Sequence, residues 1–191
     1  MSRLTEVFKL NTFELARRAG EMKEYELDIE VPEKIGLDLI SVAVGAVIEV
    51  DARLESVAEG ILLSADLYAV ATGECTRCLD PVEIVIEKRI QELYLYQQKI
   101  ERKGRAPVDD DLELEDELVM DGDVMDLQGP IRDAIVLSLP TNPLCELECK
   151  GLCPDCGGKW AELSPDHAHE VIDARWASLT AMEIGGLDFK N

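Results

Sequence analysis

The six cysteines of the chain fall into two groups whose spacing is typical of metal ligands. Cys75 and Cys78 form one Cys-x2-Cys pair, and four further cysteines lie between Cys145 and Cys156 with the spacing Cys-x3-Cys-x3-Cys-x2-Cys. Zinc takes four thiolates in a tetrahedron, and thiolates suit it better than they suit magnesium or calcium. Four cysteines within twelve residues therefore predict a structural zinc site.

Two ligand sets are compatible with this spacing. Cys153-Pro154-Asp155-Cys156-Gly157 has the form of a tight turn in which backbone amides point at the sulfur atoms and a glycine follows the second cysteine. The favoured set is local and the alternative joins the two groups across the chain, with His167 or His169 placed to replace one cysteine. The local set is Cys145, Cys149, Cys153 and Cys156, and the alternative set is Cys75, Cys78, Cys153 and Cys156.

The pair Cys75 and Cys78 lies between two predicted strands. A thioredoxin-like redox pair is expected at a helix N-terminus after a strand, so this position disfavours redox chemistry. Arg77, between the two cysteines, is interpreted either as a phosphate contact or as an exposed turn residue.

The N-terminal residues and the hydropathy of the chain predict a cytoplasmic protein without a membrane segment. Residues 1–10 have neither a basic region nor a long apolar stretch, as a signal peptide would require. No segment approaches the roughly 20 apolar residues that span a bilayer. In a reducing cytoplasm, clustered cysteines are more often metal ligands than disulfides.

The net charge of −21 is concentrated toward the C-terminus. Residues 1–105 carry 14 basic and 20 acidic side chains, whereas residues 106–191 carry 5 basic and 20 acidic side chains. Such a field repels phosphate backbones, so broad non-specific RNA binding is disfavoured. The charge favours either simple solubility or a docking surface for a basic partner, such as a ribosomal protein.

Short alternating segments predict an α+β fold built on antiparallel strands. Strands are expected at 25–31, 42–50 with a bulge at Gly45, 60–70, and 82–87 with a continuation toward Tyr96. Turns rather than crossover helices join them, which favours antiparallel pairing. Short helices are expected at 11–19, 127–138 and 174–182. The expected architecture is an antiparallel sheet or partly closed barrel with a C-terminal zinc-binding cysteine knuckle.

Three regions follow from this organisation. Residues 1–96 are predicted to form a β-rich core that carries the Cys-x-Arg-Cys turn. Residues 97–125 are predicted to form a charged flexible loop, since ten of the eighteen residues from Asp109 to Asp126 are acidic and none is basic. Residues 126–191 are predicted to carry a helix, the four-cysteine motif and a last helix that packs on the same domain.

Three segments resemble a known family. Cys75-Thr76-Arg77-Cys78-Leu79-Asp80-Pro81 is similar to the Cys-x-Arg-Cys-Leu signature of the YceD-like proteins, called large ribosomal RNA subunit accumulation proteins. The segments 143–157 and 172–179 resemble the C-terminal cysteine motif and the closing segment of its zinc–cysteine branch. One departure is Gly157-Gly158-Lys159-Trp160, where small and Asn-containing residues are usual, and it puts only local packing in doubt.

The resemblance implies a role in making or accumulating 23S ribosomal RNA, without a catalytic residue. Some members keep only the Cys-x-Arg-Cys pair, which favours the local zinc set. The partner is expected to be precursor ribosomal RNA or a basic large-subunit ribosomal protein, and not a membrane or a small-molecule substrate. Candidate contacts to RNA or to another partner are the basic residues Arg77, Lys88, Arg89, Lys99, Arg102, Lys103 and Arg105.

An enzyme is the contrasting hypothesis, and the sequence disfavours it. Catalytic zinc keeps an open position and uses histidine or carboxylate ligands, whereas four cysteines close the coordination shell. The chain has no glycine-rich phosphate loop and no Gly-x-Ser-x-Gly motif. A zinc-stabilised protein-interaction module unrelated to ribosomes is the third hypothesis.

Overall fold

The computed structural model describes residues 3–97, 117–169 and 175, and it divides into two compact units. The first unit is Met1–Cys149 and the second is Lys150–Asn191, so the division falls inside the region 126–191. The named elements all lie in the first unit. They are the 3-10 helix η1 (Arg3–Phe8), the strands β1 (Lys9–Asn11), β2 (Met22–Glu30), β3 (Ile35–Gly36), β4 (Ile40–Val42), β5 (Val47–Ser56), β6 (Gly60–Glu74), β7 (Pro81–Leu95) and β8 (Val124–Asp126), and the helix α2 (Gln128–Ser138).

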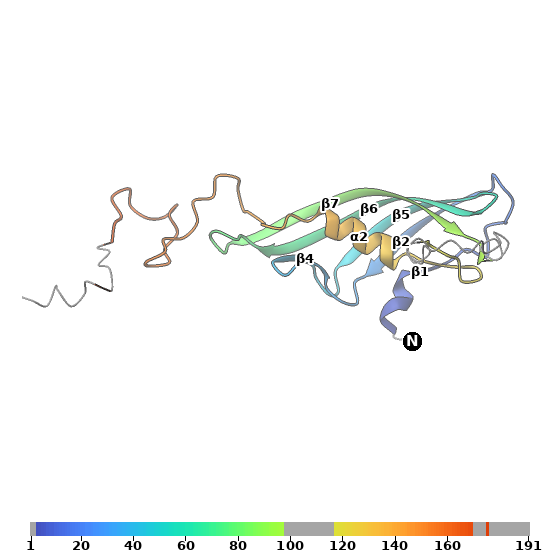
Figure 1. Ribbon diagram of the computed structural model, residues 1–191, viewed down its shortest axis with the longest axis horizontal. Helices are drawn as coiled ribbons and strands as arrows, with labels where there is room; N and C mark the ends of the chain where they lie inside the picture. The colour runs from blue at the N-terminus through green and yellow to red at the C-terminus, as the bar shows by residue number, and fades with distance from the viewer. Residues whose placement is uncertain (1–2, 98–116, 170–174, 176–191) are drawn as a thin grey trace, which may run out of the picture. The chain divides into compact units, whose positions relative to one another are not determined.

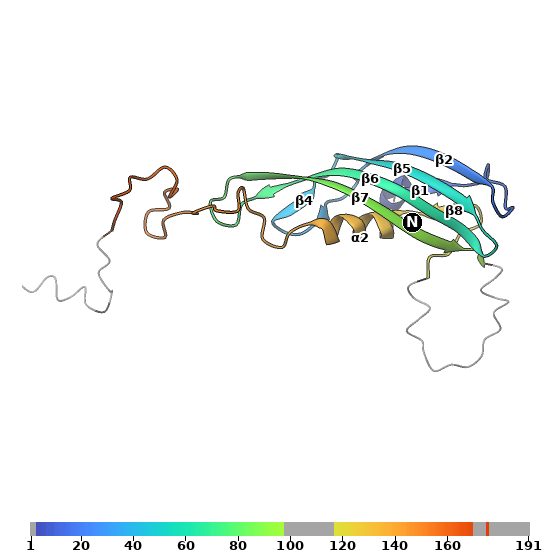
Figure 2. The same ribbon diagram turned by 90° about the horizontal axis from the view of Figure 1, so that it is seen from above.

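Six strands form one antiparallel sheet around the long strand β6. One edge of β6 pairs with β5 and, further along, with β4, and the other edge pairs with β7 over its whole length. β2 extends the sheet beyond β5 (Figures 1 and 2). The short strand β3 pairs with β4. The predicted α+β fold with an antiparallel sheet is confirmed, and of the two predicted forms the open sheet is the one observed.

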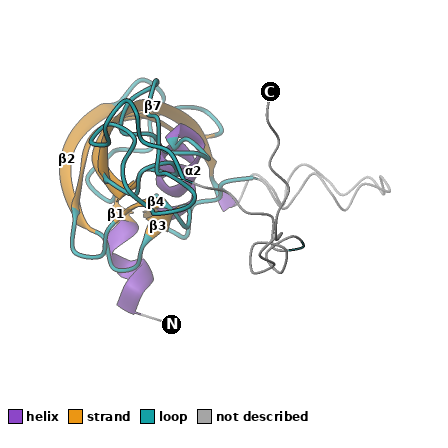
Figure 3. Ribbon diagram, turned by 90° about the vertical axis from the view of Figure 1, so that its left-hand side faces the viewer, coloured by secondary structure: helices purple, strands orange, loops and turns teal. Residues whose placement is uncertain are grey.

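Alternating burial gives the sheet one apolar face and one solvent face. Along β5, Ile48, Val50, Ala52 and Leu54 are buried, while Glu49, Asp51 and Arg53, which alternate with them, are exposed. The register places Val50 opposite Leu67 and Leu54 opposite Leu63 on β6, so the apolar side chains form a continuous layer. Burying each such side chain contributes roughly 1.5–3 kcal/mol. Figure 3, seen along the strands, shows the sheet curving around α2, which contacts β7 and β3.

The predicted strands are all present, but the second one is divided. The run 42–50 contains the end of β4 and the start of β5. Gly45 lies between these strands with a φ of 80°, and its N–H donates a hydrogen bond to the carbonyl of Val31. The predicted bulge at Gly45 is therefore wrong, because this glycine forms a turn that reverses the chain.

The predicted helix α2 is confirmed, with bounds Gln128–Ser138. Asp126 lies just before it, where its carboxylate accepts a hydrogen bond from the N–H of Gln128 at 2.9 Å. Ile131 and Ile135 are fully buried. No described helix is long or apolar enough to cross a membrane.

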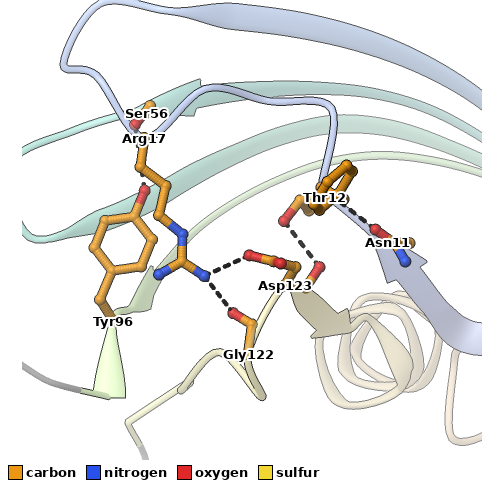
Figure 4. A network of polar contacts seen from close by, with 8 residues as sticks. Asn11, Thr12, Arg17, Ser56, Tyr96, Gly122 and Asp123 are labelled. Atoms are coloured by element: carbon orange, nitrogen blue, oxygen red, sulfur yellow. Dashed lines mark hydrogen bonds and ion pairs between the residues drawn. The ribbon is translucent and has the colours of Figure 1, made fainter.

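The predicted helix at 11–19 is wrong. After β1 the chain forms turns, because only short local hydrogen bonds such as Leu15 N–H to the carbonyl of Thr12 are made and other polar groups bond to distant segments. The N–H and hydroxyl of Thr12 both donate to the carbonyl of Asp123, and the N–H of Gly20 donates to the carbonyl of Ser56. Arg17 donates to the carbonyl of Gly122 and to the carboxylate of Asp123 (Figure 4). These contacts outweigh the local helical pattern.

Much of the predicted acidic loop and all of the predicted last helix except Arg175 lie outside the described residues. The C-terminal end of the loop region is described and takes part in the fold. Leu118 accepts a hydrogen bond from the N–H of Leu95, and Met120 donates one to the carbonyl of Leu95. Met120 and Met125 are buried, and β8 pairs with β1. Residues 118–125 of the predicted loop therefore take part in the fold of the first unit.

Candidate metal centre

The structure groups the six cysteines and two histidines into two sets of four. The first set, named the sheet centre, is Cys75, Cys78, Cys145 and Cys149. The second, named the C-terminal centre, is Cys153, Cys156, His167 and His169. Each set belongs to a different compact unit, and neither of the two four-cysteine sets expected from the sequence is brought together as a group.

The first half of the sheet centre is the turn that joins β6 to β7. The N–H of Cys75 donates to the carbonyl of Asp80, and the N–H of Leu79 donates back to the carbonyl of Cys75. This pair of bonds closes a tight knuckle at the end of a long hairpin. Leu79 has a φ of 62°, a left-handed conformation that favours glycine. Holding Leu79 in this conformation therefore costs free energy, which the folded turn must offset.

The second half of the sheet centre comes from the segment that follows α2. Pro143 accepts hydrogen bonds from the N–H of Thr76 at 2.9 Å and from its hydroxyl at 3.3 Å. Arg77 donates from Nη1 to the carbonyl of Cys149 at 2.8 Å. These three bonds hold the two segments together, although 67 residues separate Thr76 from Pro143.

The sulfur separations in the sheet centre fit a zinc ion. The Sγ atoms of Cys75 and Cys149 lie 3.8 Å apart, and those of Cys78 and Cys145 lie 3.5 Å apart. A tetrahedral zinc ion with Zn–S bonds of about 2.3 Å requires sulfur–sulfur separations of roughly 3.8 Å. All four sulfur atoms lie within 4.8 Å of one another. Three of the cysteines are buried and Cys145 is exposed.

The protonation of the sheet centre shows why it suits a cation. Burial raises the pKa of Cys75, but hydrogen bonds to the backbone of Cys145, Arg77 and Cys78 outweigh burial and lower this pKa to about 6. The backbone of Asp80 lowers the pKa of Cys78, but burial and the neighbouring thiols raise it above its ordinary value. The thiolate of Cys75 is thus favoured and that of Cys78 is opposed, and a bound cation would stabilise both thiolates.

The C-terminal centre begins with a second knuckle of the same construction. The N–H of Cys153 donates to the carbonyl of Gly158 at 2.7 Å, and the N–H of Gly157 donates to the carbonyl of Cys153 at 2.8 Å. Gly157 has a φ of 70° and occupies the position that Leu79 has in the first knuckle. The backbone of Cys156 lowers the pKa of Cys153, and this outweighs the opposing effect of burial.

Two histidines complete the C-terminal centre. The Nε2 atom of His167 lies 3.5 Å from the Sγ atom of Cys156 and 2.8 Å from the Nε2 atom of His169. The ring of Trp160 meets the ring of His167 edge to face, with 5.5 Å between their centroids. The four ligand atoms lie within 4.8 Å of one another. Two sulfur and two nitrogen donors are a ligand set that tetrahedral zinc sites use.

The basic residues expected to contact RNA do not form one described surface. Arg77 is occupied by its bond to Cys149. Arg89 lies on β7 opposite Asp66, with 3.8 Å between its Nε atom and the carboxylate, and Lys88 is its neighbour on the strand. Lys99, Arg102, Lys103 and Arg105 lie outside the described residues.

An open antiparallel sheet whose longest hairpin ends in a cysteine knuckle defines a small α+β protein with candidate metal centres. The chain belongs to the YceD family, described as large ribosomal RNA subunit accumulation proteins, because the family model matches residues 63–183, well over half of the chain. The matched range includes all six cysteines and both histidines.

Relatives from several bacteria support this membership. Rv2926c of Mycobacterium tuberculosis is 41% identical over 170 residues, which cover 88% of this chain and 77% of the relative. ML1660 of Mycobacterium leprae is 34% identical over 170 residues, with 88% and 74% covered. YlbN of Bacillus subtilis is 27% identical over 106 residues, with 55% and 56% covered. No solved structure matches the chain.

Proposed function

We propose that the chain is a non-enzymatic ribosome-biogenesis factor of the cytoplasm, which supports synthesis, processing or accumulation of 23S ribosomal RNA by binding. The family match over residues 63–183 carries this proposal, since the family is named for accumulation of the large ribosomal RNA subunit. The cysteine-rich centres support binding rather than catalysis, because their donors fill a tetrahedral shell.

Within this function, the sheet centre holds a structural zinc ion. Zinc would neutralise the four thiolates and supply folding energy there. The ligands come from the end of the β6–β7 hairpin and from the segment after α2, and α2 packs against β7. A metal at this point would fix that segment against the sheet. It would thereby define the surface next to the turn 75–79.

The solvent face of the sheet favours a basic protein partner over RNA. The register places Glu26 opposite Asp51 and Asp51 opposite Asp66, so three carboxylates cross three neighbouring strands before Arg89 on β7 ends the row. In the next row Asp28 lies opposite Glu49. Like charges directly opposite each other destabilise a sheet and repel phosphate. A basic large-subunit ribosomal protein would be attracted to this face and would relieve the repulsion.

Depletion of the protein in its host tests the biogenesis role. We expect a lower ratio of large-subunit to small-subunit ribosomal RNA, with fewer large subunits in a sucrose gradient. Re-expression of the full chain should restore both, and an unrelated acidic protein at the same level should not. A normal subunit profile after depletion would contradict the proposal and favour an interaction module unrelated to ribosomes.

The nature of the partner is tested by capture from a lysate of the host with the full-length chain. We expect a basic ribosomal protein to remain bound after RNase treatment and to be released by high salt. D51N/D66N should weaken capture, whereas E33Q/E59Q, which removes the same charge from exposed positions outside the strands, should not. Capture that is lost on RNase treatment would favour ribosomal RNA as the direct partner.

A further inference from the structure

We propose that the C-terminal centre binds its own zinc ion, so that the chain carries two zinc sites of different chemistry. The site lies entirely within the second compact unit and uses Cys153, Cys156, His167 and His169. It is separate from the sheet centre, and it goes beyond the function proposed above.

The knuckle of this site is already shaped for a metal. Its two backbone hydrogen bonds, at 2.7 and 2.8 Å, reproduce those of the turn 75–80, where the corresponding distances are 2.8 and 2.9 Å. A turn of this form directs backbone N–H groups toward the cysteine sulfur atoms and stabilises their thiolates.

The histidines are held near the knuckle by a compact segment. Lys159 accepts hydrogen bonds from the N–H groups of Glu162 and Leu163, which forms one turn after the knuckle. Ser164 then accepts a hydrogen bond from the N–H of His167 at 2.9 Å, which forms a second turn. These turns return the chain to the sulfur of Cys156, and Trp160 packs on the ring of His167.

The unit has little else that would hold this geometry. Among its described residues only Gly151 and Cys153 are buried, and its described backbone pairing is limited to a bridge between Leu152 and Lys159 together with turns. A segment this small rarely folds without a metal, a disulfide or an apolar core. A metal ion bound between them would explain why the two histidine side chains converge on two cysteines.

The donor set selects zinc over other metals. Thiolate and imidazole together disfavour magnesium and calcium, which prefer oxygen ligands. Two thiolates balance the charge of the divalent ion, whereas four thiolates in the sheet centre leave a net negative charge. The two sites should therefore differ in affinity and in spectroscopic signature.

Zinc content of the purified full-length chain tests the proposal. We expect two zinc ions per chain in the wild type, one in H167A/H169A and one in C75S/C78S. H167A/H169A changes only exposed or half-buried side chains of the second unit, so its sheet should fold normally. One zinc ion per chain in the wild type, or two in H167A/H169A, would overturn the proposal.

X-ray absorption at the zinc edge provides a readout that does not depend on protein concentration. Two sites with four sulfur donors and with two sulfur plus two nitrogen donors give an average of three sulfur and one nitrogen per zinc ion. The spectrum of H167A/H169A should change to four sulfur donors. A wild-type spectrum with sulfur donors alone would exclude the histidine ligands.

Discussion

The two candidate centres contain the same type of cysteine knuckle, but the structure around each knuckle differs. The sheet centre lies at the end of a hairpin whose strands are anchored in an apolar layer, and three of its four cysteines are buried. The C-terminal centre lies in a unit with only two buried described residues. A metal would therefore reinforce an existing fold in the first unit, whereas in the second it would be the main source of folding energy.

Removal of metal should produce the largest contrast between the two units. Structural zinc contributes about 10–16 kcal/mol of apparent binding energy in zinc-finger peptides, so the second unit should unfold on chelation. The sheet should keep its secondary structure after both centres lose their metal, because the apolar layer on β5 and β6 holds the strands together without it. Limited proteolysis with and without a chelator, followed by mass spectrometry of the fragments, measures this. Equal protection of residues 150–169 from proteolysis in both conditions would contradict the claim that the second unit depends on metal for folding.

A core substitution should produce the opposite contrast. Leu54 is fully buried on β5, and L54A should lower the free energy of unfolding of the sheet by about 2–5 kcal/mol. The C-terminal centre should keep its zinc ion, since it lies in the other unit. Thermal unfolding followed by circular dichroism, together with zinc content, measures both effects. Loss of the second zinc ion in L54A would show that the two units fold as one.

Loss of the Arg77 side chain should weaken the sheet centre alone. R77A removes the hydrogen bond to the carbonyl of Cys149, and partners of this kind typically change metal affinity by about 10–100-fold. Competition with a chromophoric zinc chelator measures the change. R89A, which removes a similar charge from an exposed position on β7, should leave both affinities unchanged. An equal effect of R77A and R89A would indicate a general electrostatic role instead.

The smallest expected effects concern the residue after the second cysteine of each knuckle. Leu79 adopts a left-handed conformation and is mostly exposed, so L79G should stabilise the sheet centre by up to about 1 kcal/mol. G157A should destabilise the C-terminal centre by about the same amount, although a Cβ atom there would meet nothing within 4 Å. Chelator competition compares the two. Weaker zinc binding by L79G would mean that the leucine side chain has a packing role.

Patterns within a few residues predicted much of this structure. The period-two alternation at 25–31 and 82–87 located β2 and β7, and the apolar spacing of Ile131 and Ile135 located the buried side of α2. The family resemblance, based on three short segments, is also confirmed. Each of these features depends mainly on nearest neighbours in the sequence.

Long-range pairing accounts for what the sequence did not show. The four late cysteines looked like one set because they are contiguous, but the structure places Cys145 and Cys149 with the distant turn 75–78. That grouping depends on the hydrogen bonds that Pro143 and Arg77 make between the hairpin and the segment after α2. These bonds join residues far apart in the sequence, so no local pattern predicts them. The local signal was the Cys-x2-Cys spacing of Cys153 and Cys156, which matches that of Cys75 and Cys78 and sets this pair apart from the other two late cysteines.

The contacts of Arg17 have a consequence for how this protein can change during evolution. Tyr96 and Asp123 flank the segment 98–116 on either side, and Arg17 stacks 4.9 Å from the ring of Tyr96 while it bonds to Asp123 (Figure 4). Arg17 thus holds the two flanking residues in place through contacts of its own. Because the entropic cost of closing a loop rises slowly with its length, insertions and deletions between the flanks should be well tolerated. Related proteins should therefore differ in the length and charge of this segment without compensating substitutions in the sheet.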